Sequence, residues 1–414
     1  MIRGLFRRLI RQGTLTVIFP DGRREEFGSG QPRAAIRFRD RKALLRLMLN
    51  PELAFGELYM DGGIVPEGCS IAEVLDLVVA NLAQSGTSGP AKFIRTVRRG
   101  LRPLAQFNPV RRAKHNVAHH YDLSGALFDL FLDKDKQYSC AYFSAPGETL
   151  EEAQIAKKRH IAAKLHLDRP GLKVLDIGSG WGGLALDLAR DCGAEVLGCT
   201  LSEEQFAAAT QRAAKAGLAE RAKFGLIDYR DLGGRFDRIV SVGMFEHVGA
   251  PHYDAFFAKA KSLLADDGAM LLHTIGRSDG PGTTNPWIAK YIFPGGYVPA
   301  LSEVLAAVER SGLIVTDIEV LRLHYAETCK EWRRRFVAHW ADAAALYDER
   351  FCRMWEFYLA GAEMAFRHDG QVVFQIQLAR RNDSLPITRD YMVDDERTMK
   401  FAGTEQMPRP MRAV

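Results

Sequence analysis

The chain has 414 residues, more than one hydrophobic core usually supports, so two domains are expected. Its composition, 47% hydrophobic and 26% charged, is typical of a globular protein, and no apolar run of about 18 residues could span a bilayer. The net charge of +5 suits an anionic membrane and a nucleic acid equally, while six scattered cysteines without a C-x-x-C pair argue against disulfides and zinc and favour a reducing cytoplasm.

The first eleven residues predict a helix with one apolar and one cationic face. Such a helix is typical of a membrane interface, and equally of a terminal helix that packs on its own domain with solvated arginines. No apolar segment with a small-residue cleavage site follows it, so an export signal is not expected. The apolar positions are Ile2, Leu5, Phe6, Leu9 and Ile10, and the cationic ones are Arg3, Arg7, Arg8 and Arg11.

A small α+β unit is expected next. Strands are predicted at residues 14–19 and 35–38 around a turn at residues 20–22, and helices at residues 41–49 and 71–82. A loop at residues 84–90 and a basic, helix-like stretch to about residue 112 then lead into the second domain. Because arginine is concentrated before residue 115, we expect residues 1–105 to form an N-terminal domain that binds a lipid membrane.

Beyond residue 170, apolar strands alternate with longer helical segments, which predicts an α/β fold with a mostly parallel sheet. Residues 327–366 are largely helical and rich in aromatic residues, which suits core packing or the cover of an apolar tunnel. We expect a second domain at residues 106–390 and a C-terminal tail at residues 391–414. The expected strands are 172–177, 195–200, 222–227, 238–242, 269–275 and 372–379, and the expected helices are 182–192, 203–216 and 253–264.

A glycine-rich turn joins the first of these strands to a helix. Gly178, Gly180 and Gly183 satisfy the G-x-G-x-x-G pattern of dinucleotide sites, which alone is a weak signal. Asp176 before the turn suits an ammonium or hydroxyl group, and the second strand ends in Thr200 instead of an acidic residue. Asp-x-Gly-x-Gly resembles the first motif of class I S-adenosylmethionine methyltransferases, whose fold is Rossmann-like.

That resemblance implies which residues bind S-adenosylmethionine. The turn would hold the methionine part of the cofactor, Gln205 would reach the ribose, and Asp228 would lie near the adenine. Taken individually, Gln205 and Asp228 are equally well explained as helix-cap or loop residues. The expected cofactor residues are Tyr138, Ser139, Asp176, Gly178, Gly180, Gly182, Thr200, Leu201, Gln205, Asp228 and Phe245.

Four short segments narrow the resemblance to one family. They are YSCAYF at residues 138–143, MFEHVG at 244–249, LHTIG at 272–276 and HYAET at 324–328. Together with the glycine-rich turn they resemble the cyclopropane-fatty-acid synthases, which are similar to the mycolic acid cyclopropane synthases. The resemblance implies transfer of a methylene group from S-adenosylmethionine to the cis double bond of an unsaturated acyl chain in a membrane phospholipid. The product would be a cyclopropane fatty acid.

The same resemblance implies a bicarbonate ion beside the reactive methyl group. The matching positions are Cys140, Glu246, His273, Tyr325 and, through its backbone amide, Ile275. The chemistry is consistent, because a neutral alkene reacts through carbocation character and a weak base suffices to remove the proton. Individually, a buried thiol, a glutamate that begins a helix and a core histidine explain three of these residues, but their joint occurrence favours the functional interpretation.

Other functions stay open on the sequence. A lipid methyltransferase of the same superfamily would give a methyl-branched or methylated unsaturated acyl chain. A methyltransferase for amines or RNA would carry an Asn-Pro-Pro-Tyr-like motif or a basic groove with stacking aromatics, whereas here the fourth strand leads to MFEH at residues 244–247. A lipid-transfer protein with a vestigial domain would not need intact cofactor residues.

The expected surroundings follow from the substrate. We expect a cytoplasmic enzyme, peripherally bound to the anionic inner face of the cell membrane, without a nucleic-acid partner. The family resemblance implies a homodimer. His119 and His120 have no acidic or sulfur partner at ligand spacing, so no metal is expected.

Overall fold

The computed structural model describes residues 2–85, 124–399 and 401–402. Its contacts form two compact units. The loop and basic stretch expected at residues 84–112 lie almost wholly outside the described residues, as do His119 and His120. Unit 1 comprises Met1–Arg102, Thr283–Pro294 and Ala326–Gln371, and unit 2 comprises Pro103–Gly282, Gly295–Tyr325 and Val372–Val414. The two units are therefore not separated by a single boundary near residue 105, because two later segments of the chain pack with the N-terminal segment.

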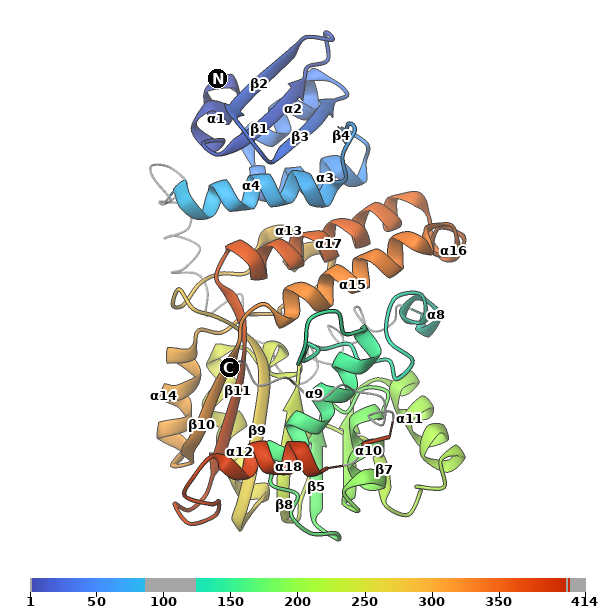
Figure 1. Cartoon of the computed structure of the whole chain (residues 1–414), viewed down its shortest axis with the longest axis vertical. Coiled ribbons are helices and arrows are strands. Elements are labelled where there is room, and N and C mark those ends of the chain that lie inside the picture. Colours follow the sequence, from blue (N-terminus) through green and yellow to red (C-terminus); the bar gives the residue numbers. More distant parts are fainter. Residues whose placement is uncertain (1, 86–123, 400, 403–414) are drawn as a thin grey trace. The chain divides into compact units, whose positions relative to one another are not determined.

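Unit 1 contains a four-stranded sheet in the order β2-β1-β3-β4 (Figure 1). β1 pairs antiparallel with β2 and parallel with β3, and β3 pairs antiparallel with β4. The polar strand β2 and the helix α3 were not expected; α3 begins at a proline that follows Asn50. The elements are α1 (Ile2–Leu9), β1 (Gly13–Ile18), β2 (Arg24–Ser29), β3 (Arg33–Phe38), α2 (Arg41–Leu49), α3 (Pro51–Met60), β4 (Ile64–Pro66) and α4 (Ile71–Ser85).

The apolar face of α1 packs inside unit 1. Phe6 is buried, with its ring centroid 5.3 Å from that of Phe27 and 6.3 Å from that of Phe38. Ile10, just beyond the helix, is buried in the same core. Leu5 on the same face is 40% exposed. Most of the face therefore packs in the core of unit 1, which favours the interpretation as a terminal helix that packs on its own domain.

The later segments of unit 1 are helical, as expected for residues 327–366. Helix α17 packs on α3 and α4, and its Ala360 and Met364 join the core of unit 1. The hydroxyl of Tyr59 on α3 donates a 2.5 Å hydrogen bond to Glu356 on α17. The large aromatic side chains Trp332 and Trp355 are buried, which favours core packing. These helices are α13 (Pro286–Tyr291), α15 (His324–Ala338), α16 (Trp340–Leu346) and α17 (Glu349–His368).

Unit 2 is built on a seven-stranded sheet in the order β10-β11-β9-β8-β5-β6-β7. The five strands from β9 to β7 are parallel neighbours, while β10 and β11 pair antiparallel. The expected α/β fold is confirmed. The strands are β5 (Lys173–Ile177), β6 (Glu195–Thr200), β7 (Ala222–Leu226), β8 (Phe236–Val242), β9 (Leu264–Arg277), β10 (Ile314–Leu321) and β11 (Gln371–Ala379).

Helices cover both faces of this sheet (Figure 1). Side chains alternate along each strand, so Val174 packs with α9 and α10 on one face, while Leu175 packs with α12 and α14 on the other. Helix α18 packs on α9, and all of it except Asp390 lies within the segment expected as a tail. The helices are α8 (Gly125–Asp129), α9 (Leu150–Lys164), α10 (Gly183–Asp191), α11 (Glu203–Lys215), α12 (Tyr253–Leu263), α14 (Leu301–Ser311) and α18 (Asp390–Thr398).

Candidate active site

A cavity of about 200 Å³ lies at the carboxyl ends of β5, β6, β7 and β8. In the sheet, β6 lies on one side of β5 and β8 lies on the other, so the direction in which the chain adds strands reverses at β5. Open parallel sheets bind ligands at the point where the strand order reverses. Nine of the expected cofactor residues line it, namely Tyr138, Ser139, Asp176, Gly178, Gly180, Thr200, Leu201, Gln205 and Asp228.

The glycine-rich turn after β5 brings backbone to the cavity wall. Gly178 and Gly180 have positive φ angles of 84° and 54°, which glycine adopts without strain. A Cβ atom on Gly180 would have no atom within 4 Å, whereas one on Gly178 would lie 2.8 Å from Met244. The space beside Gly180 is therefore free for a ligand that approaches the backbone closely.

Asp176 places a buried carboxyl group in the same wall. Burial raises the pKa of Asp176 to about 7, and the nearby ammonium group of Lys157 opposes this increase. A positively charged group that entered the cavity would favour the ionised carboxylate further. This property fits the ammonium group of the methionine part of S-adenosylmethionine.

Thr200 and Gln205, two further expected residues, also line the cavity. The hydroxyl of Thr200 at the end of β6 donates a 2.8 Å hydrogen bond to the side-chain oxygen of Gln205. Ser202 caps α11 by accepting from the backbone of Gln205, which places Gln205 in the first turn of that helix. The cap and the hydrogen bond together fix the Gln205 side chain at the cavity.

Asp228 also lies at the cavity, but its carboxylate already has a cationic partner. Arg230 donates from Nε to one carboxylate oxygen at 2.9 Å and from Nη2 to the other at 2.6 Å. Both residues line the cavity. Arg230 was not among the expected site residues, because no local pattern distinguishes it from a solvated arginine.

Two expected cofactor residues lie elsewhere. Gly182, with a φ of 82°, caps α10, and a Cβ atom there would lie 2.7 Å from the ring of Phe224. Phe245 is buried in the core and stacks on Tyr253 with ring centroids 4.3 Å apart. Neither lines the cavity, since both face the packed interior behind it.

The segment 133–143 carries Tyr138, Ser139 and Cys140 past the cavity without regular secondary structure. The ring of Tyr138 contacts Phe128 on α8 at a centroid distance of 5.3 Å. The backbone oxygen of Ser139 accepts a 3.0 Å hydrogen bond from Gln154 on α9. Cys140 is buried, and its thiol donates to the carbonyl of Ala141 at 3.3 Å.

Glu246 and β9 meet beside the cavity. The backbone amide of Ile275 donates a 2.6 Å hydrogen bond to Oε1 of Glu246. The amide that was expected to hold bicarbonate is therefore engaged by the glutamate in this structure. Burial raises the pKa of Glu246 to about 7, and its second oxygen, Oε2, is buried without a hydrogen-bond partner among the described residues.

His273 lies two residues before Ile275 on β9 and is buried. Burial, followed by the charge of Lys157, lowers the pKa of His273 well below its usual range, so the ring is neutral. The amide nitrogen of Gln375 lies 3.1 Å from Nδ1 and can only donate, which places the ring proton on Nε2. This Nε2 is buried and has no partner in the described part of the chain.

Tyr325 is the second residue of helix α15 and is buried. Its neighbour His324 accepts a 3.0 Å hydrogen bond from the backbone amide of Phe143 and stacks on Tyr142. These contacts connect the start of α15 to the segment that carries Cys140. Within residues 2–85, 124–399 and 401–402, no three His, Cys, Asp or Glu side chains could hold a metal ion.

Comparison with known proteins shows which family the chain belongs to. A family model described as "Mycolic acid cyclopropane synthetase" matches residues 109–376, and one described as a domain of unknown function matches residues 1–87. The chain is 38% identical to "Cyclopropane-fatty-acyl-phospholipid synthase" of Escherichia coli (strain K12) over 85% of this chain and 89% of that protein. It is 36% identical to "Tuberculostearic acid methyltransferase UfaA1" of Mycobacterium tuberculosis over 91% of this chain and 90% of that protein.

A solved structure matches about two thirds of the chain. The mycolic acid cyclopropane synthase CmaA1, crystallised with SAH and CTAB, matches with a TM-score of 0.61 and 36% identity, covering 66% of this chain and 99% of that one. The chain belongs to the mycolic acid cyclopropane synthetase family of S-adenosylmethionine-dependent methyltransferases.

Proposed function

We propose that this enzyme transfers a methylene group from S-adenosylmethionine to the cis double bond of an unsaturated acyl chain in a membrane phospholipid, with bicarbonate as the active-site base. The product is a cyclopropane fatty acid. The relative named cyclopropane-fatty-acyl-phospholipid synthase supports this substrate, since the match covers 85% of the chain.

The observation that carries the proposal is a pair of buried polar atoms beside the cofactor cavity. Nε2 of His273 carries a proton, and Oε2 of Glu246 carries one below pH about 7. Both atoms are without a partner among the described residues, which is costly unless a ligand satisfies them. Two buried hydrogen-bond donors suit a small anion, and bicarbonate fits that description.

The proposed chemistry assigns separate tasks to these groups. S-adenosylmethionine supplies an electrophilic methyl group, and bicarbonate supplies a weak base. Asp176 binds the ammonium group of the cofactor, while Glu246 and His273 hold and orient the anion. The lipid double bond forms a carbon–carbon bond with the methyl group as the carbon–sulfur bond breaks, and loss of one proton closes the ring.

The test is a product analysis. Purified enzyme is incubated with S-adenosylmethionine and vesicles of a cis-monounsaturated phospholipid, and the acyl chains are analysed by gas chromatography with mass spectrometry. We expect a saturated-ring chain that is one CH2 heavier, and its rate should fall about 100-fold or more in Glu246→Ala, which removes the hydrogen-bond donor for the anion. Unchanged affinity of the variant for S-adenosylhomocysteine would show that only the chemistry is affected. A lack of any modified chain would refute the proposal.

A second candidate has its own support, because the relative named tuberculostearic acid methyltransferase matches over 91% of the chain. In that case the enzyme methylates the lipid alkene and gives a methyl-branched or methylated unsaturated acyl chain. The same mass spectrum separates the candidates, since a branched or unsaturated product of equal added mass would select this one. The homodimer implied by the family resemblance stays a prediction, which light scattering would check.

We further propose that unit 1 binds the anionic inner face of the cell membrane, through α2 instead of α1. Leu45 and Leu49 on α2 are 55% and 77% exposed, next to the exposed Arg41 and Lys42. Exposed leucines beside cations suit the boundary between anionic headgroups and acyl chains. No helix within the described ranges is long and apolar enough to cross a membrane.

Vesicle sedimentation tests this surface. Changing Leu45 and Leu49 together to serine should lower binding to anionic vesicles at least about tenfold, because each leucine would lose its apolar burial in the lipid. Leu82→Ser is the matched control, since Leu82 is 54% exposed on α4 and should leave binding unchanged. Equal binding of the double variant and the wild type would disprove the assignment to α2.

A further inference from the structure

Helix α9 contains an unusual number of buried polar side chains. Gln154, Lys157, Lys158, His160 and Lys164 are all buried on this one helix. Burial of a lysine is costly unless its ammonium group is hydrogen-bonded or paired, so each of these residues needs a partner. The partners of Gln154, Lys157 and Lys158 include residues of the segment 133–143, which carries Tyr138, Ser139 and Cys140.

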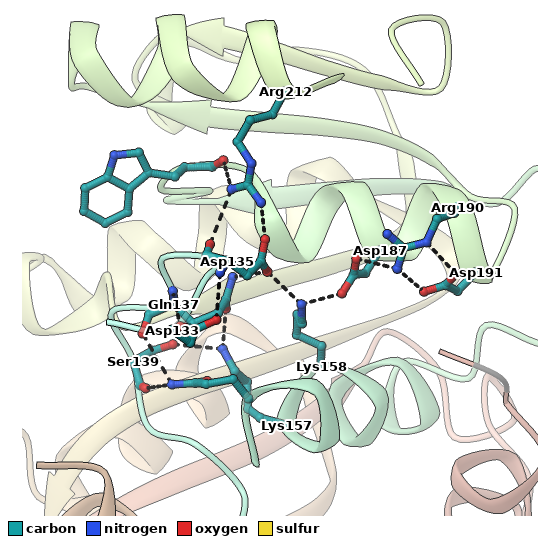
Figure 2. A network of polar contacts seen from close by, with 12 residues as sticks. Asp133, Asp135, Gln137, Ser139, Lys157, Lys158, Asp187, Arg190, Asp191 and Arg212 are labelled. Carbon is teal, nitrogen blue, oxygen red and sulfur yellow. Dashed lines mark hydrogen bonds and ion pairs between the residues drawn. The ribbon is translucent and has the colours of Figure 1, made fainter. Parts of the chain in front are cut away.

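The two neighbouring lysines have different partners, as Figure 2 shows. Lys158 bridges Asp135 at 2.6 Å and Asp187 on α10 at 2.5 Å, and Asp135 also pairs with Arg212 of α11. These ion pairs fasten the segment to α9, α10 and α11. None of the carboxylates in this group lines the cofactor cavity.

Lys157 points instead at residues of the cavity wall (Figure 2). Its ammonium group donates to the side-chain oxygen of Gln137 at 2.5 Å and to the hydroxyl of Ser139 at 3.0 Å. Both acceptors are uncharged, so neither neutralises the lysine. The positive charge of Lys157 is therefore held directly behind two cavity-lining side chains.

Several charged or titratable groups surround this ammonium group. Asp133, Asp135 and Cys140 interact with it from the segment 133–143, and Lys158 interacts with it from α9. Asp176 on β5 and His273 on β9 also interact electrostatically with Lys157. Cys199 on β6 also interacts electrostatically with Asp176. Lys157 is the only cation that acts on Asp176 within the part of the chain that the structure describes.

We propose that Lys157 is a positioning residue for the cofactor. Its ammonium group, fixed by Gln137 and Ser139, keeps the buried Asp176 carboxylate ionised and ready to bind the ammonium group of S-adenosylmethionine. The same interactions hold Ser139 at the cavity wall. This role concerns the cofactor site and does not depend on which lipid product is formed.

The charge of Lys157 affects the protonation of Asp176 near neutral pH. Burial raises the pKa of Asp176 to about 7, and burial lowers the pKa of Lys157 to about 8. Between these values the aspartate is anionic and the lysine cationic. Without the lysine charge, the pKa of Asp176 would rise further, because burial would act without opposition. Asp176 would then be protonated at neutral pH, where the cofactor needs its carboxylate.

Calorimetric titration with S-adenosylhomocysteine between pH 6.0 and about 8.5 tests this role. For the wild type, affinity should fall as the pH drops through about 7, the value at which Asp176 takes up its proton. In Lys157→Met the midpoint of this fall should move upward by about one pH unit or more, with about tenfold weaker binding at pH 7 and recovery toward pH 8.5.

Lys158→Met is the matched control, because it removes a neighbouring buried lysine from the same helix and the same segment. It should lower the thermal unfolding temperature without moving the midpoint of binding. Lys157→Gln is a second uncharged variant that keeps hydrogen-bonding capacity, and it should show the same upward shift. The proposal would be overturned if folded Lys157→Met and Lys157→Gln lost affinity for S-adenosylhomocysteine at the same pH midpoint as the wild type. This holds even if their binding were weaker at every pH.

Discussion

At the scale of single residues, the site is defined by titratable groups whose charges are altered by burial. Glu246 and Asp176 both have a pKa raised to about 7, chiefly by burial, while His273 is held neutral. Such groups destabilise the fold unless a ligand or counter-charge compensates them. The ligands that we propose for these groups would offset this cost.

Replacing Glu246 by glutamine should stabilise the protein at alkaline pH. The carboxyl pKa rises from its usual 4.5 to about 7 on folding, so the native state binds the proton more tightly than the unfolded chain. The contribution of this group to stability is present below pH about 4.5 and is lost as the pH rises through about 7. A shift of about 2.5 units corresponds to about 3 kcal/mol.

Urea unfolding of the wild type and Glu246→Gln measures this effect. Their unfolding free energies should be similar at pH 5, and the variant should be more stable by about 3 kcal/mol at pH 8. Glutamine can still accept from the Ile275 amide, so the local geometry is retained. If the unfolding free energies of the variant and the wild type differed by the same amount at pH 5 and pH 8, the raised pKa of Glu246 would be contradicted.

At the scale of elements, two glycines in the turn between β5 and α10 have different surroundings: one borders the cavity and the other packs against the protein interior. Gly180 borders the open cavity, whereas Gly182 starts α10 and packs against Phe224 and Ala209. The two glycines are two positions apart and both have positive φ angles. Substitutions in this one turn should therefore separate binding from stability.

Gly182→Ala should destabilise the protein strongly with a smaller effect on ligand affinity in the folded fraction. Its Cβ atom would lie 2.7 Å from Phe224 and 2.9 Å from Ala209, and the left-handed backbone adds strain, for a total of about 3 kcal/mol. Gly180→Ala meets no protein atom and should cost about 1 kcal/mol, but its methyl group enters the cavity and should weaken S-adenosylhomocysteine binding. Thermal unfolding and calorimetric titration measure both effects, and the reverse order would refute this division.

At the scale of the whole molecule, unit 1 is assembled from three separate segments of the chain. Helix α17 lies near the C-terminal end of the sequence but packs on α3 and α4, with Phe357 against Phe55 at a centroid distance of 5.8 Å. Gly56 permits this approach, because a Cβ atom there would lie 2.8 Å from the ring of Phe357. Sequence order is therefore a poor guide to what folds together.

A chain that begins at residue 106 should consequently fail to fold as a stable, monodisperse protein. Removing α3 and α4 would expose the buried face of α17, including Ala360 and Met364, and leave Glu356 without its Tyr59 partner. We expect dye binding to exposed apolar surface and aggregation in size-exclusion chromatography. Tyr59→Phe in the full chain is the mild comparison, with an expected loss of about 1 to 3 kcal/mol. A soluble, cooperatively unfolding truncated chain would contradict this account.

The sequence by itself determined the elements whose signals are local. The strand expected at residues 195–200 and the helix at residues 41–49 occur with those bounds, because apolar spacing and caps are read within a few neighbouring residues. The glycine-rich turn and Asp176 were also predictable from a local motif, whereas Thr200, Leu201 and Gln205 were expected as cofactor residues through the family resemblance. Helix α9 was not expected, since its buried Lys157, Lys158 and Lys164 obscure the apolar period.

Only the tertiary structure decided which distant groups meet. Most of the apolar face of α1 packs in the core of unit 1, and the backbone amide of Ile275 donates to Glu246. Arg230 pairs with Asp228, and the ammonium group of Lys157 donates to the hydroxyl of Ser139. Apart from the Asp228–Arg230 pair, these contacts join residues that lie far apart in the sequence. A charged side chain looks the same in a sequence whether it is solvated or buried, and only packing around it determines its partners and its pKa.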